Sequence, residues 1–140
     1  VGVYMCYFLH GAINEGVKAS DYNNIMKNSQ YHFNVGTVEN VNKSVKKRDA
    51  LYRLTSSHCD CDTPIGKKDT EDVELEDFAK TLRKLKTVRG IKYILLSKNW
   101  WDQNNEKQKT VHIDDINLLR FLANIEDSCL YKIELYPKYY

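Results

Sequence analysis

The chain has 140 residues, 42% of them hydrophobic, and carries 21 basic and 19 acidic side chains for a net charge of +2. Its length is typical of one domain, so we expect a single globular domain over residues 1–140. The small net charge excludes the strong overall field that a general nucleic-acid or membrane partner would require. No apolar run approaches the roughly 18 residues of a membrane span, so we expect no membrane partner.

The N-terminal run VGVYMCYFLHGAI is the longest apolar segment. It lacks the basic flank and the small-residue cleavage site of a signal peptide, and Met5 is either an internal start or a core residue. Four cysteines are too few for a small disulfide scaffold, and a bridge between Cys59 and Cys61 would be strained. We therefore expect reduced thiols and a cytoplasmic protein.

The first half of the chain predicts three strands and two helices. Residues 3–9 are continuously apolar, which is typical of a strand inside a sheet. Ser20 and Asp21 offer an N-cap for a helix over residues 22–27, and alternation at residues 31–35 predicts a half-exposed edge strand. Valines at helical spacing predict a second helix over residues 38–45, and residues 51–55 predict a third strand.

The clearest helix follows at residues 72–88, because Leu75, Phe78, Leu82 and Leu85 recur at helical spacing and Gly90 suits the C-terminal end. Residues 91–96 predict a fourth strand, residues 101–110 a polar loop, residues 113–125 a fourth helix, and residues 129–135 an alternating strand at a sheet edge. This order predicts an α/β fold with a single five-stranded mixed sheet and four helices. The alternative is an α+β fold with a largely antiparallel sheet.

Residues 58–62, HCDCD, are the densest group of reactive side chains in the sequence. On a strand, Cys59 and Cys61 would share one face at about 6.6–6.8 Å separation, whereas two thiolates on one zinc require sulfurs within about 4 Å. No CxxC or histidine pair nearby supplies further ligands. We therefore expect no metal and no cofactor, and we interpret Cys59 as a small buried residue at a strand end.

A catalytic interpretation of the same segment depends on the sheet topology. If the first, third and fourth strands are parallel, their carboxyl ends bring together residues 10–15, residues 58–62 and residues 99–102. Cys59 or Cys61 would then be a nucleophile, with His10 or His58 as its base and an aspartate orienting the imidazole. A cysteine-dependent enzyme, or a thiolate metal site at the same cysteines, is the alternative hypothesis.

The adjacent Trp100 and Trp101 follow the fourth predicted strand and cannot both enter one core. At least one indole is expected to be exposed, and exposed aromatic residues often mark protein contacts. Together with Asp102 and the rest of the WDQNNEKQKT segment, they form the predicted binding surface. The main hypothesis is therefore a non-catalytic module that binds another protein or regulates it.

Basic residues at positions 80–89 suggest a third hypothesis, nucleic-acid binding. Acidic residues gather at the other end of the same predicted helix, as the helix dipole favours, and Glu76 and Lys80 are spaced to pair. We therefore expect a solvated helix face and no nucleic-acid partner. The sequence contains no Gly-rich phosphate loop, GxSxG, HExxH or paired CxxC, so it names no reaction.

Overall fold

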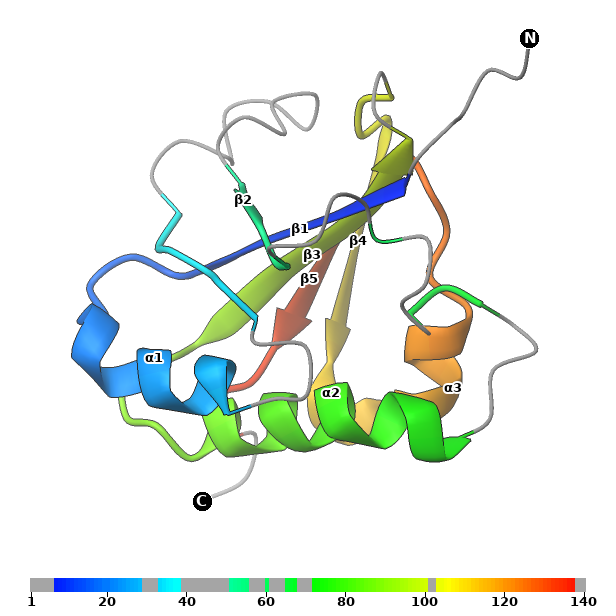
Figure 1. Ribbon diagram of the computed structural model, residues 1–140. Helices are drawn as coiled ribbons and strands as arrows, with labels where there is room; N and C mark the ends of the chain where they lie inside the picture. The colour runs from blue at the N-terminus through cyan, green and yellow to red at the C-terminus, as the bar shows by residue number, and fades with distance from the viewer. Residues whose placement is uncertain are drawn as a thin grey trace, which may run out of the picture.

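The computed structural model describes residues 7–28, 33–38, 51–55, 60, 65–67, 72–100 and 103–137, with residues 72–74 described by their backbone alone. These residues form one five-stranded sheet in the order β2-β1-β3-β5-β4 (Figure 1). The strands are β1 (Tyr7–Ile13), β2 (Tyr52–Arg53), β3 (Tyr93–Trp100), β4 (Lys107–His112) and β5 (Cys129–Glu134). The helices are α1 (Ala19–Lys27), α2 (Asp72–Lys86) and α3 (Leu118–Ala123), with a 3-10 turn, η3 (Ile113–Asp115), before α3.

The sheet is mixed, as the main fold prediction states. β1 pairs antiparallel with β2 and β3, β3 pairs antiparallel with β5, and β5 pairs parallel with β4. The parallel pair decides against the largely antiparallel alternative. The assumption that the first and fourth predicted strands are parallel is wrong, because Tyr7 lies opposite Trp100 and Ile13 opposite Ile94. The long connection between these strands is compatible with either direction, so their spacing in the sequence could not decide it.

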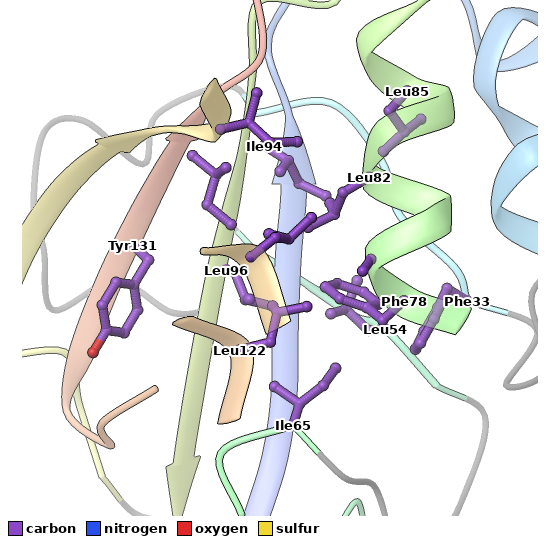
Figure 2. Packing of buried hydrophobic residues seen from close by; sticks show 14 of the residues in the cluster. Phe33, Leu54, Ile65, Phe78, Leu82, Leu85, Ile94, Leu96, Leu122 and Tyr131 are labelled. Atoms are coloured by element: carbon purple, nitrogen blue, oxygen red, sulfur yellow. The ribbon is translucent and has the colours of Figure 1, made fainter. Parts of the chain in front are cut away.

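The three described helices pack on one face of the sheet (Figure 1). The predicted apolar face of α2 is confirmed, because Leu75, Phe78, Leu82 and Leu85 are all at most 1% exposed. Figure 2 shows Leu82 directed from α2 toward the sheet, where Ile94 and Leu96 of β3 also belong to the core. Gly90 has the left-handed φ of +95° that suits glycine, but α2 ends four residues earlier, at Lys86, so Gly90 belongs to the turn before β3 rather than to the end of the helix.

A smaller apolar cluster lies on the opposite face of the sheet. Leu95 alternates along β3 with Ile94 and Leu96, so its side chain points away from the helices. It packs there with Ala12 of β1 and Leu130 of β5. The central strands are therefore buried on both faces, which explains the near-continuous apolar runs in their sequences.

Of the strand predicted at residues 31–35, residues 33–35 are described and do not form a strand, and residues 31–32 lie outside the described residues. Residues 33–38 run beside β1, where Ile13 N–H donates to Gly36 O at 2.8 Å and Val38 N–H donates to Ile13 O at 2.7 Å. Phe33 is fully buried, because its ring packs edge-on against Phe78 with centroids 4.8 Å apart. Apart from Val38, the helix predicted at residues 38–45 lies outside the described residues, which contain three α-helices rather than the predicted four.

The polar segment predicted as a loop at residues 101–110 includes the start of β4, so this prediction is wrong from Lys107 onward. The side chains of residues 107–110 are exposed, and β4 therefore shows no alternation of buried and exposed positions there. Because β4 occupies the edge, the final strand β5 is internal, contrary to the prediction of an edge strand. An edge strand can be formed by backbone pairing with one neighbour, without a hydrophobic pattern of its own.

Two helices differ in their limits from the prediction. The helix predicted at residues 113–125 is divided into η3 and α3, and Asn117 caps α3 by accepting the N–H of Arg120 at 3.1 Å. Helix α1 begins at Ala19, with Lys18 at the N-cap and no side-chain cap bond, rather than at a Ser20 or Asp21 cap. Core contacts of Tyr22 and Met26 hold α1 in place.

Candidate functional site

Asp60 is the only described residue of the HCDCD segment, and it is a structural carboxylate. Only 1% of the Asp60 surface is exposed. Oδ2 accepts the Leu9 N–H at 2.7 Å and pairs with Arg53 Nη2 at 3.1 Å, and Oδ1 accepts the Thr55 hydroxyl. Its own N–H donates to Tyr7 O at 2.9 Å. Asp60 therefore joins β1 to the segment that contains β2.

The proposed catalytic residues are only partly within the described part of the chain. His58, Cys59 and Cys61 lie outside the described residues, so the cysteine-dependent hypothesis stays a prediction. His10 lies on β1 opposite Arg53 and Ser97 and is half-buried. By strand alternation, its side chain is on the face of the sheet away from Leu9 and the helices.

The antiparallel β1–β3 pair separates the side chains that parallel strands would have brought together. Asn14 lies near the start of β3, where its Oδ1 accepts the Lys92 N–H at 2.6 Å and its Nδ2 donates to Gly90 O at 3.0 Å. Asn99 lies near the other end, where its Oδ1 accepts the Ser128 N–H at 2.8 Å. Both amides connect segments of backbone, so they are structural residues.

A cavity of about 300 Å³ opens where β3 ends, on the helix-covered side of the sheet. Lys98 of β3 lines it although this residue is only 8% exposed, which is uncommon for a lysine. Lys98 Nζ lies 4.2 Å from the centroid of the Tyr7 ring and 3.5 Å from Gly66 O. The remaining lining comes from the connection between α3 and β5, at Asn124, Ile125, Glu126 and Asp127.

Gly66 is fitted closely to the lysine. A Cβ at this position would lie 2.9 Å from both Cδ and Nζ of Lys98, and the φ of +79° is one that other residues rarely adopt. Gly66 N–H donates to Leu122 O at 2.7 Å, which attaches this short segment to α3. The position of Lys98 therefore depends on a glycine and a helix that lie far from it in the sequence.

Trp100 adjoins this cavity through Tyr7. Its ring stacks on Tyr7 with centroids 3.4 Å apart and planes inclined by 29°, and the residue is half-buried. The turn after β3 is held by Gln103, whose Nε2 donates to Asp127 Oδ2 at 3.1 Å. Trp101 and Asp102 of the predicted binding surface lie outside the described residues.

Sequence reasoning missed the Lys98 cavity because it ended the strand at Leu96. A usable signal was present, since YILLSKNW places a lysine directly after an apolar run. A lysine directly after an apolar run can end the strand or can continue it and be buried with it. The structure shows the second outcome, which only the contacts of Tyr7 and Gly66 reveal.

Two further buried groups, Cys129 and Tyr131, belong to β5. Cys129 is a buried free cysteine, and burial raises the pKa of its thiol. Burial also raises the pKa of Tyr131 to about 12, although its hydroxyl accepts the Glu126 N–H at 2.9 Å. His112 caps η3, with Nδ1 accepting the Asp114 N–H at 3.1 Å and Nε2 lying 2.8 Å from Tyr136 O.

The basic end of α2 is engaged in exposed ion pairs. Arg83 Nη1 lies 2.6 Å from Glu76 Oε1, and Lys86 Nζ pairs with Asp114 before α3. Glu76 thus pairs with Arg83 in the structure, rather than with Lys80 as the spacing predicted. Such pairs are typical of a solvated helix face, and they lend no support to nucleic-acid binding.

Comparison with protein-family models, with curated proteins and with solved structures found no match to this chain. Among the described residues, no helix is both long and apolar enough to span a membrane. The same residues contain no cluster of three or more histidine, cysteine or acidic side chains that could hold a metal ion. Two further features, the edge strand β4 and the Lys98 cavity, have a geometry that can bind a partner or a ligand.

Proposed function

We propose that this chain is a protein-binding domain that adds an extended segment of its partner to the outer edge of β4. The observation that carries the proposal is the position of β4, which pairs with β5 on one side and is the last strand of the described sheet. An edge strand presents backbone donors and acceptors that can pair with another chain. Adding a strand to such an edge is a common mode of peptide recognition.

The backbone of β4 has the regularity that this mode requires. Lys107 N–H donates to Ser128 O at 3.0 Å, so the peptide groups of Lys107 face β5. In a parallel ladder the direction alternates, and the peptide groups of Gln108 and Thr110 therefore face away from β5. The side chains of Gln108 and Thr110 are exposed, so nothing bulky from the described core covers this edge.

The charge of the edge indicates the kind of partner. Lys107 and Lys109 are both exposed, and the run KQKT contains no acidic residue. Lys109 Nζ lies 3.4 Å from Glu126 Oε2, but this ion pair is exposed and therefore weak. Edge lysines hinder pairing with neutral or basic strands, which limits aggregation. A strand that carries carboxylates opposite them gains favourable cross-strand pairs instead. The partner segment is therefore an extended acidic peptide.

A synthetic peptide tests this proposal. A blocked peptide of alternating Glu and Val should shift the backbone amide resonances of residues 107–112 in an NMR titration, and a matched Lys and Val peptide should not. Gln108→Pro should abolish binding, because it removes an outward N–H, while the fold is retained because that N–H makes no bond to β5. Gln108→Ala is the matched control and should bind like the wild type.

Three results would contradict the proposal. The first is equal binding of the acidic peptide by folded Gln108→Pro and Gln108→Ala. The second is equal binding of the acidic and basic peptides, and the third is a set of shifts confined to residues outside β4. Circular dichroism of the proline variant establishes that any loss of binding is not caused by unfolding.

A further inference from the structure

The Lys98 cavity has the features of a small-molecule site that is separate from the β4 edge. Its volume of about 300 Å³ lies at the small end of the usual range for ligand pockets. It contains a lysine of which more than nine-tenths is buried, one aromatic ring and one side-chain amide. Burial of a charged side chain is costly, so a buried charge that lines a cavity is a recurring mark of a binding site.

The inner end of the cavity suits a carboxylate. A lysine ammonium carries three N–H donors and can bond several acceptors at once, so the 3.5 Å contact with Gly66 O does not prevent Lys98 from also binding a ligand oxygen. A charge-assisted bond of this kind is stronger in a partly dehydrated cavity than in water. The Tyr7 ring, with its centroid 4.2 Å from Nζ, makes a cation–π contact with the ammonium.

The lining residues nearer solvent have the opposite charge. Glu126 and Asp127 both line the cavity and are exposed. Each has one described partner, because Glu126 Oε2 lies 3.4 Å from Lys109 Nζ and Asp127 Oδ2 accepts from Gln103. Two carboxylates at the opening disfavour a ligand that is anionic throughout, and they favour one whose outer end is positive.

The geometry points to a site for a small amino-carboxylate, a zwitterion whose carboxylate binds Lys98 and whose ammonium lies near Glu126 and Asp127. The ligand is compact, because the cavity is small. Asn124 offers a side-chain amide beside the same opening. This site does not depend on β4 as a peptide-binding edge, so either conclusion can fail without the other.

Single-charge analogues test the requirement for both charges. Glycine, β-alanine and γ-aminobutyrate would be titrated by calorimetry against the full chain, with butyrate and butylamine as the single-charge probes. At least one amino-carboxylate should bind more tightly than both single-charge probes. Equal or tighter binding of butyrate, or no binding of any probe at millimolar concentrations, would overturn the proposal.

Substitutions locate the binding. Lys98→Met keeps the length of the side chain and should weaken the best amino-carboxylate by about tenfold or more, as expected for a lost charge-assisted bond. Lys84→Met, on the exposed face of α2, is the matched control and should bind normally. Glu126→Gln and Asp127→Asn together should weaken the amino-carboxylate and strengthen butyrate.

Binding that is unchanged in Lys98→Met would refute the inner contact. If Lys98→Met does not fold, as judged by circular dichroism, the exposed Glu126→Gln and Asp127→Asn pair decides the question. Unchanged discrimination between γ-aminobutyrate and butyrate in that pair would refute the proposal in that case.

Discussion

Replacement of Asp60 by alanine should destabilise the fold more than removal of its arginine partner. The Asp60 carboxylate is fully buried, and its partners among the described residues include the Leu9 N–H at 2.7 Å, Arg53 Nη2 at 3.1 Å and the Thr55 hydroxyl. Alanine would leave the Leu9 donor unsatisfied inside the sheet, which by itself costs about 1–3 kcal/mol. Loss of the charged bonds raises the expected cost to about 3–5 kcal/mol in the free energy of unfolding.

The arginine side of this pair is different. The Arg53 side chain is 32% exposed, so water can solvate its guanidinium when Asp60 is absent, and water can screen the pair when it is present. Arg53→Met removes only the partly exposed partner, but it leaves the fully buried Asp60 carboxylate with the Leu9 N–H and the Thr55 hydroxyl and without its counter-charge. We therefore expect a cost of about 1–3 kcal/mol, below that of Asp60→Ala. Asp60→Asn keeps an acceptor oxygen but loses the charge, and we expect a cost between these two values.

Urea unfolding followed by far-ultraviolet circular dichroism measures these costs. The series contains the wild type, Asp60→Ala, Asp60→Asn, Arg53→Met and the Asp60→Ala, Arg53→Met double variant. If the denaturant slope is the same for all of them, the differences in midpoint report differences in stability rather than changes in the unfolded state. An Asp60→Ala cost within about 1 kcal/mol of zero would refute the reasoning, since ordinary surface changes reach about 0.5 kcal/mol. Equal costs for Asp60→Ala and Arg53→Met would also refute it.

Leu82→Ala should lower the free energy of unfolding by about 2–5 kcal/mol, because it leaves a cavity in the core. The exposed change Lys84→Ala should lower it by less than about 0.5 kcal/mol. Equal urea midpoints for the two variants would show that the buried face of α2 is wrongly assigned. Burial raises the pKa of Tyr131 from 10.0 to about 12, so the unfolded chain releases the phenol proton at a lower pH than the folded protein does. The free energy of unfolding should therefore be unaffected below pH 10 and should fall by on the order of 2 kcal/mol as the pH rises through 12. Tyr131→Phe should reduce this alkaline loss, and an unchanged pH profile would contradict the assignment. Cys129 should resist alkylation at neutral pH until the protein unfolds, because burial raises the pKa of its thiol. Peptide mapping would identify the thiols that react fastest in the folded protein, and the cysteine-dependent alternative expects Cys59 to be one of them.

Local pattern was sufficient for the elements whose residues repeat with a structural period and face the core. The α2 face of Leu75, Phe78, Leu82 and Leu85 was predicted residue by residue, because a helix turns every 3.6 residues and each of these side chains enters the same core. Alternation at Cys129, Tyr131 and the following residues likewise predicted β5. Such signals are local, since they depend only on the repeat of one element.

Local pattern did not suffice where an element has no buried face or where a partner sets its role. Strand β4 is polar and exposed over its first four residues, so its existence depends on the backbone of β5. The position of β5 inside the sheet follows from the same pairing. The alternation in β5 indicated one solvated face, but it could not show that another strand would pair along its edge.

The candidate sites were decided almost entirely by tertiary structure. The sequence alone identified the HCDCD segment and Trp100 as notable, but the role of Asp60 follows from a bond to Leu9, 51 residues away. Lys98 is buried because β1 brings Tyr7 to it and because Gly66, 32 residues away, leaves room for its ammonium. Residue type sets the chemistry that a side chain can perform. Which charge is buried, and beside which groups, is set by contacts between segments distant in the chain, and no local periodicity encodes those contacts.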